Sequence, residues 1–185
     1  MRRLGLTIAA AALATAFSAT LTAQKTTEVH PGRGGSPHVK TDYAIDGAKI
    51  SVTYGRPSLK GRAEAQVMPP GKEWRTGADE ATLLTTDKAL KFGSVSLQPG
   101  TYTVNTVPGS EWQIVFGKLG EKGEKQWGIP YQSALEVGRT PMKVGKTKAP
   151  AEQLTIAVDD TASGGTLRIE WGNTSASAPF TVAST

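Results

Sequence analysis

The chain has 185 residues, no cysteine, and a formal net charge of +5 from 21 Lys and Arg against 16 Asp and Glu. The absence of cysteine excludes a disulfide scaffold and a cysteine nucleophile, so stability must come from a buried core and paired strands. The positive charge is mild and scattered through turns, which disfavours a nucleic-acid-binding surface and indicates a solvated one.

The first 23 residues have the organisation of a secretory signal peptide. Arg2 and Arg3 precede an apolar, alanine-rich run that ends in small residues around Thr22 and Ala23. This run is too short and too weakly flanked to persist as a membrane span. We therefore predict cleavage near Ala23, export to the periplasm or the extracellular space, and no membrane span in the mature protein.

Residues 24–40 are rich in Gly, Pro and small polar residues, and they predict a flexible lead-in to a single domain over residues 41–185. The two histidines of the chain, His30 and His38, lie in this segment. As zinc ligands they lack a third partner, so we predict no metal and no cofactor. His38, close to the start of the domain, is the better candidate if either histidine binds a metal.

From residue 48 onward, short β-branched and aromatic stretches alternate with Gly, Pro, Asp or Ser turns about every ten residues. This rhythm predicts an all-β fold: an antiparallel β-sandwich of Greek-key, immunoglobulin-like type, with about nine strands and little helix apart from the signal peptide. The predicted strands are Lys49–Tyr54, Ala81–Asp87, Leu90–Leu97, Thr101–Val107, Glu111–Phe116, Ala134–Val144, Gln153–Asp159, Thr166–Trp171 and Ala178–Val182.

Within the strands predicted over 153–159 and 166–171, apolar residues occupy every second position, which predicts one buried face. The polar, glycine-containing residues between these two strands suit a hairpin. The residues of the predicted face are Leu154, Ile156, Val158, Leu167, Ile169 and Trp171. Trp112 is also predicted to be core, whereas Trp127 and Tyr131 are left open between core and an exposed platform.

The stretch Leu97–Val104, which reads LQPGTYTV, resembles the tyrosine corner of Greek-key folds. In that corner a tyrosine just after a Pro-Gly turn donates its hydroxyl to a backbone group upstream. We therefore predict a structural role for Tyr102. The next Pro-Gly pair, at Pro108 and Gly109, predicts a type II turn between two strands of a hairpin.

The longest connection, from Tyr54 to Thr82, is the segment that could carry function, because loops of this length are usually functional or disordered. Its apolar and aromatic residues argue against disorder. Guanidinium groups near aromatic rings suit a bound carboxylate or phosphate. The predicted ligand-binding residues are Tyr54, Arg56, Arg62, Lys72, Trp74 and Arg75. The alternative is that the arginines pair with the acidic residues of the segment and brace the loop.

Glu80 is the candidate for a catalytic acid or base. It is adjacent to Asp79, and on extended backbone two neighbouring side chains point to opposite faces, so one of them at most enters a given site. The sequence has no nucleophile elbow, no phosphate-binding Gly-Lys-Thr loop and no His-Glu-x-x-His motif. These absences disfavour the familiar hydrolase and nucleotide chemistries.

Several motifs together resemble a bacterial exported family known as domain of unknown function 2911, over roughly residues 36–182. They are SVTYGRP from Ser51, KGR from Lys60, GK from Gly71, WRTGA from Trp74, EAT from Glu80, PGTY from Pro99 and EWGNT from Glu170. The resemblance implies an export signal and one domain, but no assigned reaction. It also groups the six predicted ligand-binding residues with Glu80. Where the family pattern has Asn, this chain has Asp79, whose charge would weaken anion capture unless Arg75 neutralises it.

These patterns favour an exported binding module for a small anionic or sugar-like ligand, with its site in the 54–82 segment. The second hypothesis is an envelope-associated hydrolase that uses Glu80 with an arginine cluster. The third is a structural or assembly protein with no small-molecule site. A binding site requires cationic groups that converge on an open concavity, an enzyme requires Glu80 inside it, and a brace requires every arginine to be paired.

Overall fold

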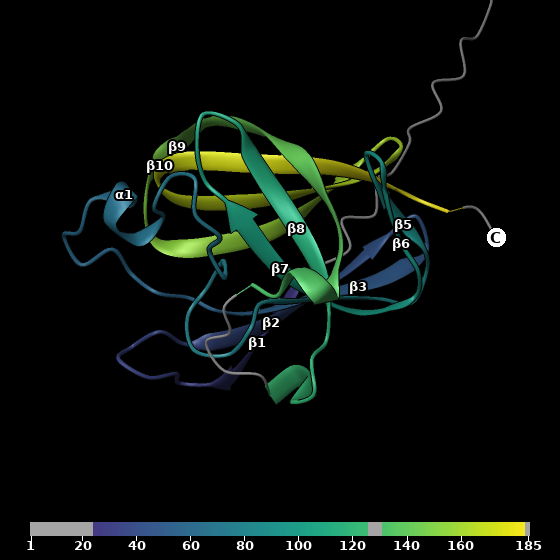
Figure 1. The fold of residues 1–185 in the computed structure, drawn as a ribbon, viewed down its shortest axis with the longest axis horizontal. Helices are drawn as coiled ribbons and strands as arrows, with labels where there is room; N and C mark the ends of the chain where they lie inside the picture. Colours follow the sequence, from purple (N-terminus) through teal and green to yellow (C-terminus); the bar gives the residue numbers. More distant parts are fainter. Residues whose placement is uncertain (1–23, 126–130, 184–185) are drawn as a thin grey trace, which may run out of the picture.

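The structure, a computed structural model, describes residues 24–125 and 131–183 and is all-β (Figure 1), which confirms the predicted fold class. The strands are β1 (Lys25–His30), β2 (His38–Ile45), β3 (Ala48–Gly55), β4 (Leu83–Thr86), β5 (Leu90–Phe92), β6 (Val95–Leu97), β7 (Gly100–Val107), β8 (Trp112–Lys118), β9 (Glu136–Thr161) and β10 (Gly164–Val182). Helix in these residues is limited to α1 (Glu64–Val67) and two 3₁₀ turns, η1 (Gly123–Lys125) and η2 (Ser133–Leu135). No described helix has the length and apolar character needed to cross a bilayer.

The ten strands form one antiparallel sheet in the order β1-β2-β3-β4-β7-β8-β9-β10-β5-β6. The pairing is continuous from β1 to β6, so the sandwich and Greek-key details of the prediction are not confirmed by it. The stretch predicted as one strand over 90–97 is a short hairpin of β5 and β6, because Gly93 adopts a positive φ of 55° and reverses the chain.

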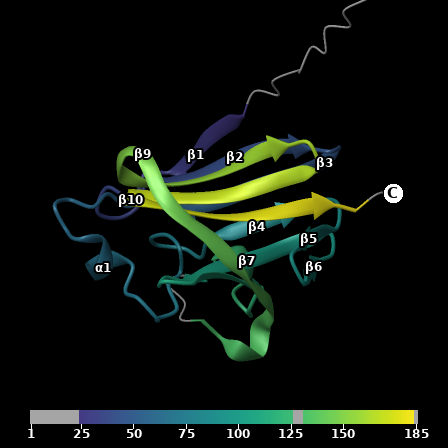
Figure 2. The same cartoon turned by 90° about the horizontal axis from the view of Figure 1, so that it is seen from above.

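Strand β9 is the element that folds the sheet over on itself. Its first residues, from Glu136 to Met142, pair with β8, whereas the remainder pairs with β10. Figure 2 shows β9 running from beside β7 toward β2 and β3. The hairpin predicted between β9 and β10 is present, with Thr161 opposite Gly164. As a result the far part of β9 and β10 covers the inner face of the earlier strands.

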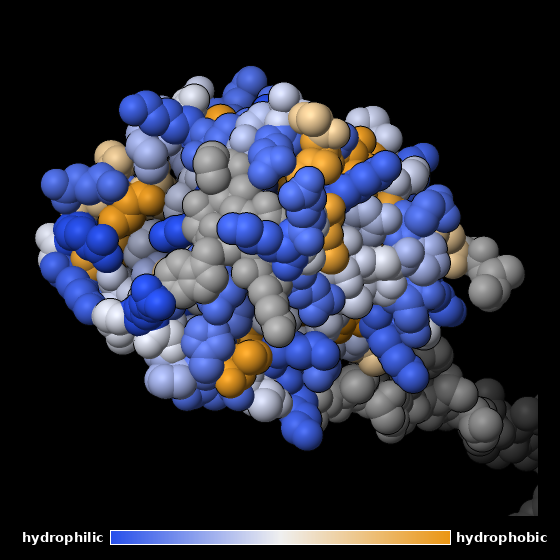
Figure 3. Space-filling view, turned by 60° about the horizontal axis from the view of Figure 1, so that its bottom comes forward, coloured by the Kyte–Doolittle hydropathy of each residue, from blue (hydrophilic) through white to orange (hydrophobic). Residues whose placement is uncertain are grey.

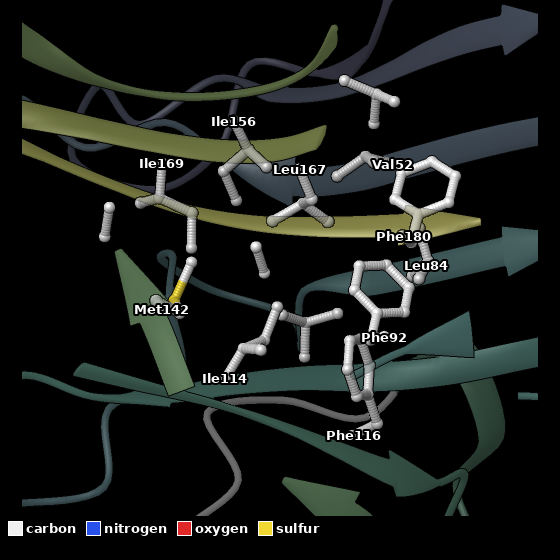
Figure 4. Close-up of a cluster of buried hydrophobic side chains, with 14 of the residues drawn as sticks. Val52, Leu84, Phe92, Ile114, Phe116, Met142, Ile156, Leu167, Ile169 and Phe180 are labelled. Carbon is white, nitrogen blue, oxygen red and sulfur yellow. The ribbon is translucent and has the colours of Figure 1, made fainter. Parts of the chain in front are cut away.

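The core lies between these two parts of the sheet (Figure 4). Ile156, Leu167 and Ile169 come from the β9–β10 side and face Ile114 and other residues of the opposite side. The six residues predicted to share a buried face are each at most 3% exposed, and Trp112 is 5% exposed, which confirms both predictions. At one end of the core, Phe92 packs at a tilt against Phe116 and Phe180, with ring centroids 4.8 and 4.9 Å apart.

The predicted tyrosine corner is confirmed. The Tyr102 hydroxyl donates to the backbone carbonyl of Gln98, four residues upstream, at 2.8 Å. This bond closes the turn between β6 and β7 and gives Tyr102 the predicted structural role.

The segment for which the sequence predicts a flexible lead-in, residues 24–40, contains β1 and the start of β2. The two strands pair from Lys25 opposite Asp42 to His30 opposite His38. Five of the six β1 residues are exposed, so the strand lacks the alternation of apolar residues by which strands are recognised. Backbone pairing with β2 orders this strand, and amino-acid composition does not reveal such pairing.

The surface is predominantly hydrophilic. Figure 3 shows one face on which polar and charged residues prevail and hydrophobic residues form small, separate patches. Among the described residues, the exposed large hydrophobic side chains are Val29 and Val144. Such isolated residues do not form an apolar docking surface, so polar contacts are the expected means of recognition.

Candidate functional site

The long connection between β3 and β4 is ordered by backbone bonds to two strand edges. On one side, Leu59 N donates to the Glu152 carbonyl, and Leu154 N donates to the Pro57 carbonyl, both at 2.9 Å. On the other side, Trp74 exchanges two backbone bonds with Thr106 of β7, of 2.8 and 2.9 Å. The connection is therefore fixed at both its start and its middle, and its side chains have defined positions.

Tyr54 and Arg56 continue the first of these contacts with their side chains. The Tyr54 hydroxyl accepts the Ile156 N–H at 2.8 Å, and it is buried, which raises its pKa. Arg56 donates to the Leu154 carbonyl and to the Thr155 hydroxyl, both at 3.2 Å. The two side chains thus satisfy the open edge of β9, and we call this row of contacts the β3–β9 seam.

Trp74 and Trp171 form an aromatic wall next to the seam. Their rings stack with centroids 5.7 Å apart and planes 13° apart. Trp74 is 9% exposed and Trp171 3%, and the indole N–H of Trp171 donates to the Glu152 carbonyl at 3.0 Å. The stack closes one end of the core, and its outer edge lines an open pocket.

We call this concavity, of about 560 Å³, the cationic pocket, because Arg33, Lys60, Arg62 and Arg75 line it. Arg62 binds its own loop through the Leu59 carbonyl at 2.8 Å and the Ser58 carbonyl at 2.7 Å. Within the described part of the chain, Arg75 makes one hydrogen bond, from Nε to the Gly77 carbonyl at 3.3 Å. Its terminal amino groups have no partner among the described residues.

The structure brings together some of the predicted ligand-binding residues and separates others. Arg62, Trp74 and Arg75 share the cationic pocket. Tyr54 and Arg56 belong to the β3–β9 seam instead, and Lys72 is exposed and does not line the pocket. Two cationic residues that the prediction did not include, Arg33 and Lys60, complete the pocket. Their contribution depends on the fold of the β1–β2 loop over the long connection, which leaves no local signal in the sequence.

Asp79 and Glu80 line different pockets, although Asp79 does not have the extended backbone that the prediction assumed. Asp79 adopts a positive φ of 62°, which Asn and Asp tolerate better than most residues. Its carboxylate accepts the Arg33 N–H at 2.7 Å and lines the cationic pocket. An Asn at this position could accept the same bond. Glu80 lines a different, neighbouring pocket.

Glu80 lies between the two histidines, and we call His30, His38 and Glu80 the His–Glu cluster. The Nε2 atom of His30 is 3.2 Å from Glu80 Oε1, and the Nδ1 atom of His38 is 3.5 Å from Glu80 Oε2. The two imidazole rings are stacked, 4.9 Å apart and within 4° of parallel. Burial lowers the pKa of His38, against the opposing effect of the Glu80 charge. The neutral, lone-pair-bearing form of this imidazole is therefore favoured.

The third partner that the histidines lack in the sequence is supplied by the fold. His30 and His38 face each other because β1 pairs with β2, and Glu80 follows 42 positions later. The intervening residues PGRGGSP are turn formers, and they are the one local signal that could have predicted a hairpin with its histidines side by side. The approach of Glu80 has no such signal.

A separate ionic network lies where β8 meets β9. Arg139 donates to both carboxylate oxygens of Glu136, at 2.8 and 2.6 Å, and to Glu73 at 3.3 Å. Hydrogen bonds from Arg139 lower the pKa of Glu136 from its ordinary 4.5 to about 2. Tyr131 also donates to Glu136, and its ring lies 5.5 Å from the Arg139 guanidinium. Tyr131 is thus part of this network, while Trp127 lies outside the described residues.

Comparison with known proteins identifies a family but no characterised relative. A family model with the description "protein of unknown function (DUF2911)" matches residues 36–180. No curated protein and no solved structure gives a significant match. Arg62, Arg75, His38 and Glu80 fall inside the matched range, whereas His30 and the neighbouring Arg33 precede it.

Proposed function

We propose that this chain, which belongs to the DUF2911 family of proteins of unknown function, is a binding module for a small anionic ligand of sugar-like size. Because the family has no assigned activity, the proposal rests on the geometry of the chain's own residues. The ligand class is a uronic acid or a phosphorylated sugar, held in the cationic pocket. An N-terminal segment with the pattern of an export signal supports a ligand met in the periplasm or outside the cell.

The observation that carries the proposal is the incomplete hydrogen bonding of the Arg75 guanidinium within the described residues. Its guanidinium is partly buried and directed by one weak bond to the Gly77 carbonyl, and its terminal amino groups are left without a partner in the described part of the chain. A planar pair of free N–H donors matches a carboxylate or phosphate in a bidentate arrangement. An arginine that served only to brace the loop would have these donors bound to other groups of the protein.

The surroundings of Arg75 favour an anion of modest size. Four cationic residues line the pocket, against one carboxylate, that of Asp79, which is already engaged by the Arg33 N–H. A volume of about 560 Å³ is in the range typical of small-ligand sites. The edge of the Trp74–Trp171 stack supplies an apolar surface against which a sugar ring packs.

The alternative of a hydrolase that joins Glu80 to an arginine cluster gains no comparable support, because Glu80 does not line the cationic pocket. The structural alternative is supported by Arg56 and Arg62, whose guanidinium groups bind backbone carbonyls. Arg75 separates it from the binding proposal, and the experiment is built on that residue.

The test is a thermal-shift and calorimetric titration of the protein with glucuronate, galacturonate, glucose 6-phosphate and inorganic phosphate. A ligand at 100 times its Kd stabilises the folded state by about 2.7 kcal/mol. We expect this shift in the wild type and in the control Lys72→Gln, which loses a cation outside the pocket, but not in Arg75→Gln. Absence of a shift with every compound would overturn the proposal. An equal loss in both variants would show that net charge alone attracts the anion.

A further inference from the structure

We infer that His30, His38 and Glu80 form a binding site for a divalent transition-metal ion of the zinc type. Two imidazole nitrogens and one carboxylate are a ligand set that zinc accepts, with a fourth position left for water or substrate. The inference concerns a different pocket from the proposed anion site, and neither depends on the other.

The distances within the His–Glu cluster approach those of a coordination shell. In a tetrahedral zinc site with bonds near 2.0–2.1 Å, neighbouring ligand atoms are about 3.3 Å apart. The distance from His30 Nε2 to Oε1 of Glu80 is 3.2 Å, and the distance from His38 Nδ1 to the other carboxylate oxygen, Oε2, is 3.5 Å. One ligand atom from each of the three residues can be chosen so that all three lie within 4.8 Å of one another. Closing the cluster around an ion therefore requires the three ligand atoms to move closer together by no more than about 1.5 Å.

Two buried polar atoms in the cluster lack a hydrogen-bond partner among the residues that the structure describes. They are His38 Nδ1 and Glu80 Oε2, and they face each other at 3.5 Å. Leaving a buried donor or acceptor unsatisfied costs about 1–3 kcal/mol, so proteins rarely keep such atoms without a reason. A metal ion between them would satisfy both atoms at once, and this is the observation that points to a ligand.

The backbone holds the three side chains in place from two directions. Pairing of β1 with β2 sets His30 opposite His38. The bond from Arg33 N to Asp79 ties the β1–β2 loop to the turn that carries Glu80. The ligands thus come from elements that are fixed to each other before any ion binds, which lowers the cost of assembling the site.

Metal binding requires a defined change at His30. The Gly32 N–H donates to Nδ1 of His30 at 3.1 Å, which places the ring proton on Nε2, beside Glu80. Coordination through Nε2 moves that proton to Nδ1 and breaks the Gly32 bond. Imidazole lone pairs lie in the ring plane, so one of the two parallel rings must also rotate for both nitrogens to face one ion.

The cluster opens onto a pocket large enough for an exchangeable ligand. The pocket has a volume of about 740 Å³, and its lining includes the hydroxyl-bearing residues Ser51, Thr53 and Thr85. Three protein ligands with an accessible fourth position are typical of zinc sites that bind water or a substrate, whereas structural zinc sites are closed by four protein ligands.

The experiment is a competition titration of Zn²⁺ against a chromophoric chelator, with Co²⁺ absorption as a reporter of tetrahedral coordination. The variants are His30→Gln and Glu80→Gln, and the control is Glu124→Gln, which neutralises a carboxylate lining the same pocket outside the cluster. His30 is used rather than the buried His38 because its side chain is 36% exposed, so folding is less sensitive to the change. Melting curves without metal verify that each variant is folded.

We expect one Zn²⁺ per chain in the wild type and in Glu124→Gln. The affinity should fall at least about tenfold in His30→Gln and in Glu80→Gln, since even loss of an outer-shell partner costs that much. Nitrogen NMR should show the His30 proton on Nδ1 only when Zn²⁺ is present. No stoichiometric binding, or binding unaffected by both variants, would overturn the inference. Anion binding at the cationic pocket is measured separately and should persist in both variants.

Discussion

Replacement of Tyr54 by Phe tests the assignment of this residue to the β3–β9 seam rather than to a ligand site. Its hydroxyl accepts the Ile156 N–H at 2.8 Å and lies 3.4 Å from the Ile156 carbonyl, with the side chain 2% exposed. Tyr54→Phe removes the partner of this buried N–H. An unsatisfied buried donor costs about 1–3 kcal/mol, so we expect a loss of about 2 kcal/mol in the free energy of unfolding.

For a domain of this size such a loss lowers the Tm by about 4–8 °C. The measurement is urea unfolding followed by tryptophan fluorescence, with the midpoint and the slope fitted together. The matched control is Tyr43→Phe, whose hydroxyl contacts the same Ile156 carbonyl at 3.5 Å, the limit of a hydrogen bond. The control should cost less than Tyr54→Phe. If the Tyr54→Phe protein were as stable as the wild type, or lost only ligand binding, the assignment of Tyr54 to the β3–β9 seam would be refuted.

Two further predictions concern charge and backbone strain. The pKa of Glu136 is depressed to about 2 in the folded protein, so its pairing with Arg139 contributes stability that is complete above the ordinary pKa of 4.5 and is lost as pH falls toward 2. Urea midpoints should therefore drop across this window in the wild type and less in Arg139→Gln; equal acid sensitivity would contradict the assignment. Gly172→Ala should cost about 2 kcal/mol or more, because φ is +62° and the added methyl would displace the Glu64 carboxylate from its bonds with the Asn173 N–H and the Thr174 hydroxyl. In Gly61→Ala, with φ of +75° and open space, only the strain remains, so chemical denaturation should show a smaller loss; equal losses would rule out the contact with Glu64.

The features that the sequence predicts well are those that local chemistry controls. The alternation in β9 and β10 buries every predicted residue, from Leu154 to Trp171, because successive side chains of a strand face opposite ways. The Pro-Gly turn before Tyr102 predicts its bond to the Gln98 carbonyl for a similar reason: the two groups are four residues apart.

The structure divides the predicted ligand-binding residues between different sites. Residue type alone could not predict this division, because it does not distinguish a ligand-binding arginine from a bracing one. Arg56 and Arg75 occur in the same segment with similar neighbours. Only the path of β9 decides that Arg56 meets the Leu154 carbonyl, while the terminal amino groups of Arg75 have no partner in the described ranges and Arg75 lines a pocket. Charge in a sequence predicts that a partner is needed, and the tertiary fold decides which partner is within reach.

By itself, then, the sequence determined the all-β class, the buried faces and the turn that Tyr102 closes, since each depends on residues a few positions apart. The tertiary structure alone decided that β1 is ordered, that β9 carries the sheet over the core, and that His30 and His38 meet Glu80. Those outcomes depend on backbone pairing between segments tens of residues apart, and the free energy of such pairing is set by the whole fold rather than by any local pattern.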